Sequence, residues 1–192
     1  MNLLVLGPQG AGKGTQAKRI SLDHAIPHIS TGEIFRAAIA AGSELGRQVE
    51  PILASGALVP DEITIPLIRE RLGEPDAARG FILDGYPRTE PQAAALDEML
   101  AGIGRGLDAI VFFDLPDDVA TERLLVRAAE ENRPDDTPEV IARRLATYHA
   151  ETEPIVEHYR LSGKLVPLHA ERAVPEVYAE IEAALAELEG AA

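Results

Sequence analysis

A glycine-rich segment near the N-terminus holds the residues of this sequence best suited to chemistry. It reads Gly7-Pro8-Gln9-Gly10-Ala11-Gly12-Lys13-Gly14-Thr15 and lies directly between a short apolar run and a helical pattern. Glycines have no side chain to block a ligand and tolerate positive φ, so the backbone N–H groups can wrap around a phosphate chain. The following helix would add its N-terminal dipole, and Lys13 a charge at the β- and γ-phosphates. The segment therefore predicts a nucleotide phosphate site.

The residue after Lys13 departs from the general phosphate-loop pattern. That pattern has Ser or Thr at this position to bind magnesium, whereas this chain has Gly14 and carries its hydroxyl one residue later, at Thr15. The loop is therefore not of the switch-GTPase form.

The net charge limits the partners that this chain can bind. Its 192 residues include 18 Lys and Arg and 32 Asp and Glu, which gives −14 at pH 7. Nucleic acids and anionic membranes are held by basic faces, so we expect neither as a partner. A phosphate ligand must instead be held locally, by donors at hydrogen-bond range. The absence of cysteine excludes disulfides, thiol nucleophiles and Cys-ligated zinc.

Short apolar runs alternate along the chain with longer helical patterns, which is typical of βαβ units around a parallel sheet. Strands are predicted at 2–6, 28–29, 80–84, 109–114 and 164–168. Helices are predicted at 12–22, 31–41, 43–55, 61–72, 89–100, 117–129, 138–161 and 175–188. The length suits a single α/β domain.

Two stretches interrupt this alternation. Three successive helical patterns at 31–72 exceed what one crossover needs, so we expect an inserted helical subdomain. The charged, proline-containing stretch 128–137 predicts an exposed loop that could move as a lid. The N-terminal apolar run has no basic flank, and no stretch approaches the ~20 apolar residues of a membrane span, so we expect a cytoplasmic protein.

Motifs spread over the whole chain resemble the adenylate kinases among the nucleoside monophosphate kinases. Beyond the phosphate loop, the matching residues are Ser30-Thr31-Gly32 with Arg36, Asp84-Gly85-Tyr86-Pro87-Arg88 with Gln92, Glu122-Arg123 with Arg127, Arg133-Pro134-Asp135-Asp136, and Arg143-Arg144-Leu145 with Tyr148 and Glu153-Pro154. The order and the spacing both match, and the combination is highly specific. Thr31 and Gln92 resemble the side of the acceptor pocket that reads adenine.

The resemblance implies an α/β P-loop kinase core with a five-stranded parallel sheet flanked by helices. The core would comprise residues 1–29, 60–126 and 138–192, with a helical subdomain for the nucleoside monophosphate at 30–59 and a short lid at 127–137. The short lid implies that no zinc is bound. The resemblance also implies a monomer that transfers a phosphoryl group reversibly from MgATP to AMP, giving two ADP, in adenine nucleotide homeostasis.

The family's site residues carry over to the matching positions of this sequence. Catalytic roles are implied for Lys13, Arg88, Arg123, Arg133 and Arg144. ATP binding is implied for Gly10, Ala11, Gly12, Lys13, Gly14, Thr15, Arg123, Arg127 and, through the backbone of its segment, Arg172. AMP binding is implied for Thr31, Arg36, Val59, Gly85, Arg88, Gln92, Arg133 and Arg144. Asp84 is implied to orient magnesium through the water shell of the ion.

Arginine suits this reaction because two polyanions must be brought together in line. Its planar fork donates two hydrogen bonds to a phosphate and stays charged on burial, whereas lysine fixes orientation less well. No general base is needed, because the accepting phosphate oxygen is already anionic.

Other interpretations stay open at this point. A UMP/CMP kinase would share the fold, the loop and the lid, and a catalytically inactive regulatory protein would bind ATP without transferring phosphate. Asp84 could cap the neighbouring turn, and Gln92 could be a surface helix residue. We interpret Arg143 as a structural or surface residue. The five histidines are interpreted as structural, because their spacing does not suggest a metal site.

Overall fold

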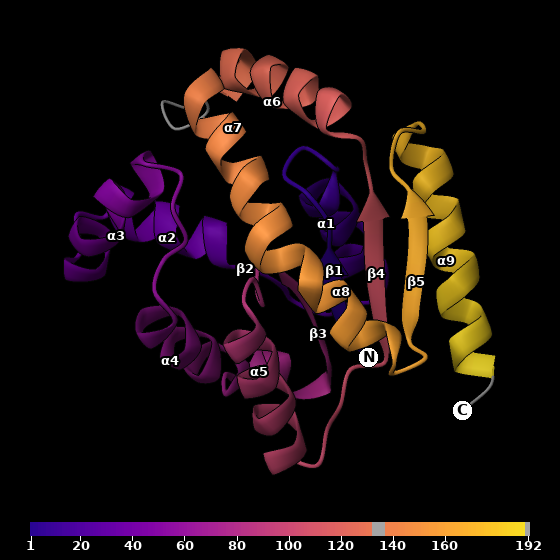
Figure 1. The fold of residues 1–192 in the computed structure, drawn as a ribbon. Helices are drawn as coiled ribbons and strands as arrows, with labels where there is room; N and C mark the ends of the chain where they lie inside the picture. Colours follow the sequence, from indigo (N-terminus) through magenta and orange to yellow (C-terminus); the bar gives the residue numbers. More distant parts are fainter. Residues whose placement is uncertain (132–136, 191–192) are drawn as a thin grey trace.

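One parallel sheet forms the centre of the molecule (Figure 1). The computed structural model describes residues 1–131 and 137–190, and within them five strands pair in the order β2-β3-β1-β4-β5. They are β1 (Asn2–Leu6), β2 (His28–Ser30), β3 (Phe81–Asp84), β4 (Ala109–Asp114) and β5 (Leu165–His169). Every strand begins and ends within one residue of its predicted limits, and the predicted α/β fold class is confirmed.

Helices cover the sheet and extend beyond its carboxyl ends. They are α1 (Lys13–Asp23), α2 (Thr31–Ala40), α3 (Glu44–Ala54), α4 (Asp61–Leu72), α5 (Glu90–Gly102), α6 (Asp117–Glu131), α7 (Pro138–Thr147), α8 (Glu153–Arg160) and α9 (Val174–Gly190), with a 3-10 helix η1 (Pro75–Arg79) and a π-helical segment η2 (Tyr148–Thr152). Among the helices in the described ranges, none is both long and apolar enough to cross a bilayer.

The expectation of one unbroken helix over 138–161 is wrong in one respect. The π-helical segment η2 lies between α7 and α8. Pro154 follows it in the first turn of α8 and has no N–H group to continue the helical hydrogen-bond ladder, so a wider turn forms there. The 3-10 helix η1 was not predicted, because Pro75 and Gly80 bound a segment too short for a periodic pattern.

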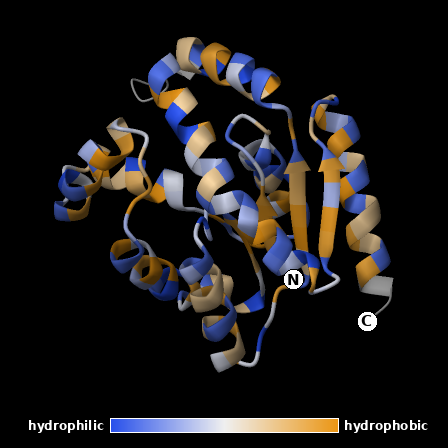
Figure 2. Cartoon of the chain, viewed as in Figure 1, coloured by the Kyte–Doolittle hydropathy of each residue, from blue (hydrophilic) through white to orange (hydrophobic). Residues whose placement is uncertain are grey.

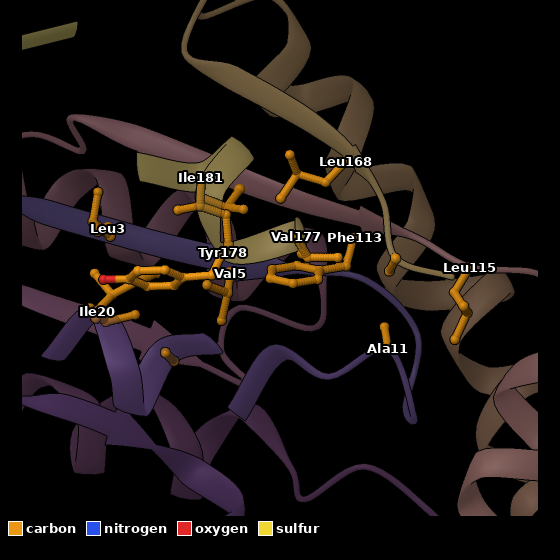
Figure 3. Packing of buried hydrophobic residues seen from close by; sticks show 14 of the residues in the cluster. Leu3, Val5, Ala11, Ile20, Phe113, Leu115, Leu168, Val177, Tyr178 and Ile181 are labelled. Carbon is orange, nitrogen blue, oxygen red and sulfur yellow. The ribbon is translucent and has the colours of Figure 1, made fainter. Parts of the chain in front are cut away.

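Both faces of the sheet are buried, as the near-continuous apolar runs of its strands require. Alternate residues of β1 enter two separate core clusters: Leu3 and Val5 pack on one face, and Leu4 and Leu6 on the other. Figure 3 shows the first cluster, in which Phe113 of β4 packs with residues of α1 and α9. Figure 2 shows hydrophobic residues along β4 and β5, whereas hydrophilic and hydrophobic residues alternate along the helices. The sheet is therefore a rigid platform for the loops at its carboxyl ends.

The inserted helices α2 and α3 have a small core of their own. Its buried residues are Phe35, Val49 and Val59, with a few partly buried neighbours. Side-chain caps set both helix starts, because Ser30 accepts from the Glu33 N–H at 3.4 Å and Ser43 from the Gly46 N–H at 3.0 Å. Three successive helices thus lie between β2 and β3, while the subdomain limits 30–59 stay a prediction.

Candidate active site

The glycine-rich loop joins β1 to α1, as the sequence predicts. Gly10 and Gly12 adopt φ values of 84° and 83°, which only glycine adopts without strain. A Cβ atom on Gly10 would lie 2.8 Å from the backbone oxygen of Ala120, so the loop can lie this close to α6 only with glycine here. Within the first turn of α1, as the structure describes it, no side chain caps the helix and no acidic residue is present. The backbone N–H groups there are available to an anion.

Lys13 lies at the start of α1 and folds back over the loop. Its Nζ donates to the backbone oxygens of Gly7 at 2.8 Å and Pro8 at 2.6 Å. The pKa of Lys13 is lowered to about 8, mainly by burial; the negative charge of Asp84 opposes this change, and the positive charges of Arg88 and Arg127 add to it. Burial is thus the main reason why the charged form of Lys13 is disfavoured, and a bound anion that replaced the lost solvation would favour that form.

Asp84 ends β3 at the same edge of the sheet. Its Oδ2 lies 3.2 Å from His28 Nε2, within hydrogen-bond distance, and both side chains are largely buried. Burial alone would raise the pKa of Asp84, but the His28 hydrogen bond and the charges of Lys13 and Arg88 outweigh it and hold that pKa below its usual value. The carboxylate is therefore ionised, and its side chain bonds His28.

The contact of His28 with Asp84 is one that sequence reasoning missed. His28 was interpreted as structural together with the other histidines, although β2 and β3 run parallel with Ser30 opposite Asp84. The signal was available only after the strand order was known, because nothing in the sequence alone pairs β2 with β3. Among the described residues, no group of three or more His, Asp or Glu side chains could hold a metal ion by itself.

Five arginines from four separate segments line one cavity of about 380 Å³ together with Lys13 and Asp84. They are Arg36 of α2, Arg88 after β3, Arg123 and Arg127 of α6, and Arg144 of α7. Burial lowers the pKa of Arg88, and repulsion from Arg144 and Arg36 lowers it further, although Asp84 opposes the change. Like charges that crowd this closely in an acidic protein mark a site for a polyanion.

A smaller cavity of about 40 Å³ lies on the α2–α3 side of Arg88. Its lining includes Thr31, Val59, Gly85 and Gln92, four of the residues expected around AMP. Thr31 Oγ1 and Arg88 Nε both donate to the Gly85 backbone oxygen at 2.8 Å. Gly85 has φ 77°, and a Cβ there would lie 2.7 Å from Thr31 Oγ1, so this arrangement requires glycine.

Gln92 is 2% exposed, which excludes its interpretation as a surface residue. Its side-chain oxygen accepts from the Arg88 N–H at 2.8 Å, and its amide nitrogen donates to Asp61 Oδ1 at 2.6 Å. Gln92 therefore holds the backbone of Arg88 in place. Asp61, which also accepts from Thr89 Oγ1, was not singled out in the sequence because it reads as an ordinary first residue of α4.

The remaining predicted residues have four different outcomes. Gly10, Gly12, Gly14 and Thr15 line the larger cavity, whereas the Ala11 side chain belongs to the main core. Arg172 pairs with Glu180 on α9 and is absent from the described lining of either cavity. Arg133 lies outside the described residues.

Arg123 also connects α6 to the segment that follows β5. Its guanidinium donates to the backbone oxygens of Ala170 at 2.8 Å and Glu171 at 3.1 Å. Arg123 lies 47 residues before Ala170 and 48 before Glu171, so short-range sequence patterns could not predict this contact. The contact brings the wall of the cavity next to the loop that carries Arg172.

Comparisons with known proteins agree on one family. The family model described as adenylate kinase matches residues 5–164. The adenylate kinase of Caulobacter sp. (strain K31) is 50% identical over 185 residues, which cover 96% of this chain and 98% of the relative. That of Cyanothece sp. (strain PCC 7425) is 47% identical over 188 residues, 98% of this chain and 96% of the relative. That of Parvibaculum lavamentivorans is 46% identical over 188 residues, 96% of this chain and 92% of the relative.

Proposed function

This chain belongs to the adenylate kinase family, and from this premise we propose how its residues transfer a phosphoryl group between MgATP and AMP. The activity is that of a nucleoside monophosphate kinase, in which ATP and AMP give two ADP. The observation that carries the proposal is the cavity that five arginines and Lys13 share. Phosphoryl transfer leaves little covalent work to a protein, so aligning two polyanions and cancelling their repulsion supplies most of the rate.

The acceptor end of the site lies between α2 and the segment after β3. We assign the AMP phosphate to Arg36, Arg88 and Arg144, because these guanidinium groups lie close enough to repel one another when no anion is present. The smaller cavity next to Arg88 marks the expected direction of the adenosine, and Thr31, Val59, Gly85 and Gln92, which line it, would surround the adenine. A phosphate at this end offsets the repulsion among the arginines and orients the attacking oxygen.

The donor end is the phosphate loop with α6 above it. The N–H groups of Gly10 to Thr15 and the Nζ of Lys13 would hold the ATP phosphates, while Arg123 and Arg127 approach from α6. Arg123 would exchange its contacts with Ala170 and Glu171 for stacking on the donor adenine, beside the backbone near Arg172. Arg133 keeps its expected catalytic and phosphate-binding roles as a prediction, since it lies outside the described residues.

The site also suits magnesium bound to the ATP phosphates. Asp84 is ionised and ends a strand beside the loop, and a Cβ on Gly14 would lie 3.4 Å from its Oδ2, so no side chain at that position separates the two. Asp84 would hold the ion through the water shell of the ion. Magnesium supplies charge neutralisation at the transferring phosphates.

The protein's own residues bind and orient the two nucleotides, and Lys13 stays protonated while they do so. Bound phosphate raises the pKa of Lys13 above its value of about 8 in the free protein, so its proton remains on Nζ during transfer. The guanidinium groups gather around the charge that develops between donor and acceptor, where preorganised donors stabilise the transition state most. No side chain needs to remove a proton.

A phosphotransfer assay tests the proposal directly. Purified protein with MgATP is offered AMP, GMP, CMP and UMP in turn, and formation of the diphosphates is followed. We expect turnover chiefly with AMP. Preference for UMP or CMP would instead establish a UMP/CMP kinase, and ATP binding without any ADP formation would establish an inactive regulatory protein. Size-exclusion chromatography and cell fractionation would check the expected monomer and its cytoplasmic location.

A further inference from the structure

Two neighbouring arginines of α7 contact a single turn of the inserted subdomain. Arg143 Nη1 donates to the Ser55 backbone oxygen at 2.7 Å, and Arg144 Nη2 approaches the Leu53 backbone oxygen at 3.4 Å. Both oxygens belong to the end of α3, where Ser55 is the C-cap residue. In Figure 1, α7 passes beside the α2–α3 pair on its way to α8. The contact therefore joins the helix that follows the expected lid to the expected acceptor subdomain.

The end of α3 is a favourable place for a cation. The Ser55 N–H donates to the Pro51 and Ile52 oxygens at 3.2 Å, and the Ser55 carbonyl oxygen beyond this last turn accepts from Arg143. Carbonyl oxygens at a helix C-terminus carry the negative end of the helix dipole, so a guanidinium group there is stabilised by charge as well as by the hydrogen bond.

Backbone geometry brings this turn close to α7. Gly56 is buried and has φ 77°, and a Cβ on it would lie 3.0 Å from Val140 Cγ1 and 3.3 Å from the Val140 backbone oxygen. A larger residue at this position would push the turn away from α7. The contact of Arg143 is thus part of a tightly packed junction.

The two arginines differ in what else they touch. Arg144 lines the larger cavity together with Leu53 and Gly56 of the same turn, whereas Arg143 is exposed and is absent from the described lining. Arg143 thus binds the outer side of a turn whose inner side borders the site. It can influence the acceptor only through the position of that turn.

We propose that Arg143 is a positioning residue for the acceptor nucleotide, which rests on the proposed function of the site. Its hydrogen bond to Ser55 holds the end of α3 against α7, so that the subdomain wall and the Arg144 guanidinium reach the acceptor phosphate together. The phosphate loop has no part in this contact, so donor binding does not depend on it. The interpretation of Arg143 from the sequence as a structural or surface residue left this role out.

The test compares three variants with the wild-type protein. Arg143→Gln removes the charge and the reach to Ser55, whereas Arg143→Lys keeps a charge and a donor. Arg160→Gln is the matched control, because Arg160 is an exposed arginine that pairs with Glu157 on α8, away from the described cavity linings. KM for AMP, KM for ATP and kcat are measured for each protein, together with the AMP dissociation constant by calorimetry and the melting temperature.

For Arg143→Gln we expect KM for AMP and the AMP dissociation constant to rise about fivefold, with KM for ATP and kcat within about twofold of wild type. Arg143→Lys should lie closer to wild type, and Arg160→Gln should match it. Unchanged AMP binding in Arg143→Gln, or equal rises in KM for both nucleotides, would overturn the proposal. A wild-type protein that formed no ADP would refute the function instead, and the AMP dissociation constants would still decide the role of Arg143.

Discussion

The donor and acceptor ends of the cavity are built in different ways. The donor end is centred on a continuous loop between β1 and α1, with Arg123 and Arg127 of α6 above it, and the main core that Figure 3 shows supports this loop. The acceptor end is assembled from α2, the segment after β3 and α7, and its inserted helices rest on a core of three buried residues. A local motif on the sheet therefore fixes the phosphate loop of the donor end, whereas contacts between segments far apart in the sequence fix the acceptor end.

This difference predicts which part of the protein opens locally at the lower free-energy cost. The loop glycines are held by backbone geometry against β4 and α6, since Cβ atoms on Gly7 and Gly10 would lie 2.5 Å from the Phe113 oxygen and 2.8 Å from the Ala120 oxygen. The inserted helices have fewer buried apolar contacts, so their local opening should cost less free energy than unfolding of the sheet. Variants at the donor end should therefore change the rate of transfer, and variants around the inserted helices should change mainly the binding of AMP.

The largest effect is expected at the donor end, from Lys13→Met. The change removes the charge beside the transferring phosphate but keeps an unbranched side chain, so kcat should fall about 1000-fold while the melting temperature changes little. Steady-state assays of ADP formation measure the loss. Lys164→Met is the control, because Lys164 is an exposed lysine that donates to the Leu107 oxygen, away from the cavity. Near-normal turnover of Lys13→Met would refute its assigned role.

Arg88→Ala tests the acceptor end at the point nearest the reaction. We expect kcat to fall about 100-fold and KM for AMP to rise, because the variant removes the guanidinium that Arg36 and Arg144 surround. Arg88→Lys keeps the charge without the planar fork, so it should remain impaired about tenfold. The assay is ADP formation at varied AMP concentration. Full activity in Arg88→Lys would show that charge alone, and not the fork, matters at this position.

The pH dependence of the reaction distinguishes the pKa of Lys13 in the free protein from its pKa in the ATP complex. Because Lys13 has a pKa of about 8 in the free protein and binds phosphate only when protonated, kcat/KM for ATP should fall about tenfold per pH unit above that value. Bound phosphates raise the pKa, so kcat at saturating ATP should stay level to higher pH. Rates between about pH 6.5 and 9.5, measured at low and at saturating ATP, give the pH dependence of kcat/KM for ATP and of kcat. If kcat/KM for ATP and kcat fell over the same pH range, the assignment to Lys13 would be contradicted.

The same contrast explains what could be predicted from the sequence. The phosphate loop, the five strands and the insertion follow from short-range patterns, because glycine content and hydrophobic period are local properties. The convergence of Arg36, Arg88, Arg123 and Arg144 came from the resemblance to a family, and no spacing in the sequence alone implies it.

Residues that act through distant partners were missed for a physical reason. The His28 contact with Asp84 depends on the strand order, and the Arg143 contact with Ser55 on how α7 crosses the inserted helices. Asp61 is similar, since its bond to Gln92 joins two helices that are separated by β3 in the chain. Each residue reads as ordinary in its own segment, and only tertiary packing gives it a partner.

The smallest effect concerns the two cores. Val49 and Val111 are both fully buried, the first in the small core of the insertion and the second beneath the donor loop. Val111→Ala should lower the free energy of unfolding by about 2 kcal/mol through the lost burial and the cavity, with both KM values unchanged. Val49→Ala should cost less global stability, because its surroundings can loosen locally, but it should raise KM for AMP about threefold.

Urea unfolding and steady-state kinetics on the two variants make this comparison quantitative, since the chemical change is the same at both sites. A threefold rise of KM for AMP confined to Val49→Ala would mean that the inserted helices become ordered, independently of the sheet, when AMP binds. Equal losses of unfolding free energy, with KM for AMP unchanged in both, would mean that the insertion and the sheet unfold as one cooperative unit. The acceptor end would then be as rigid as the donor end, and the contrast between them would lie in their chemistry alone.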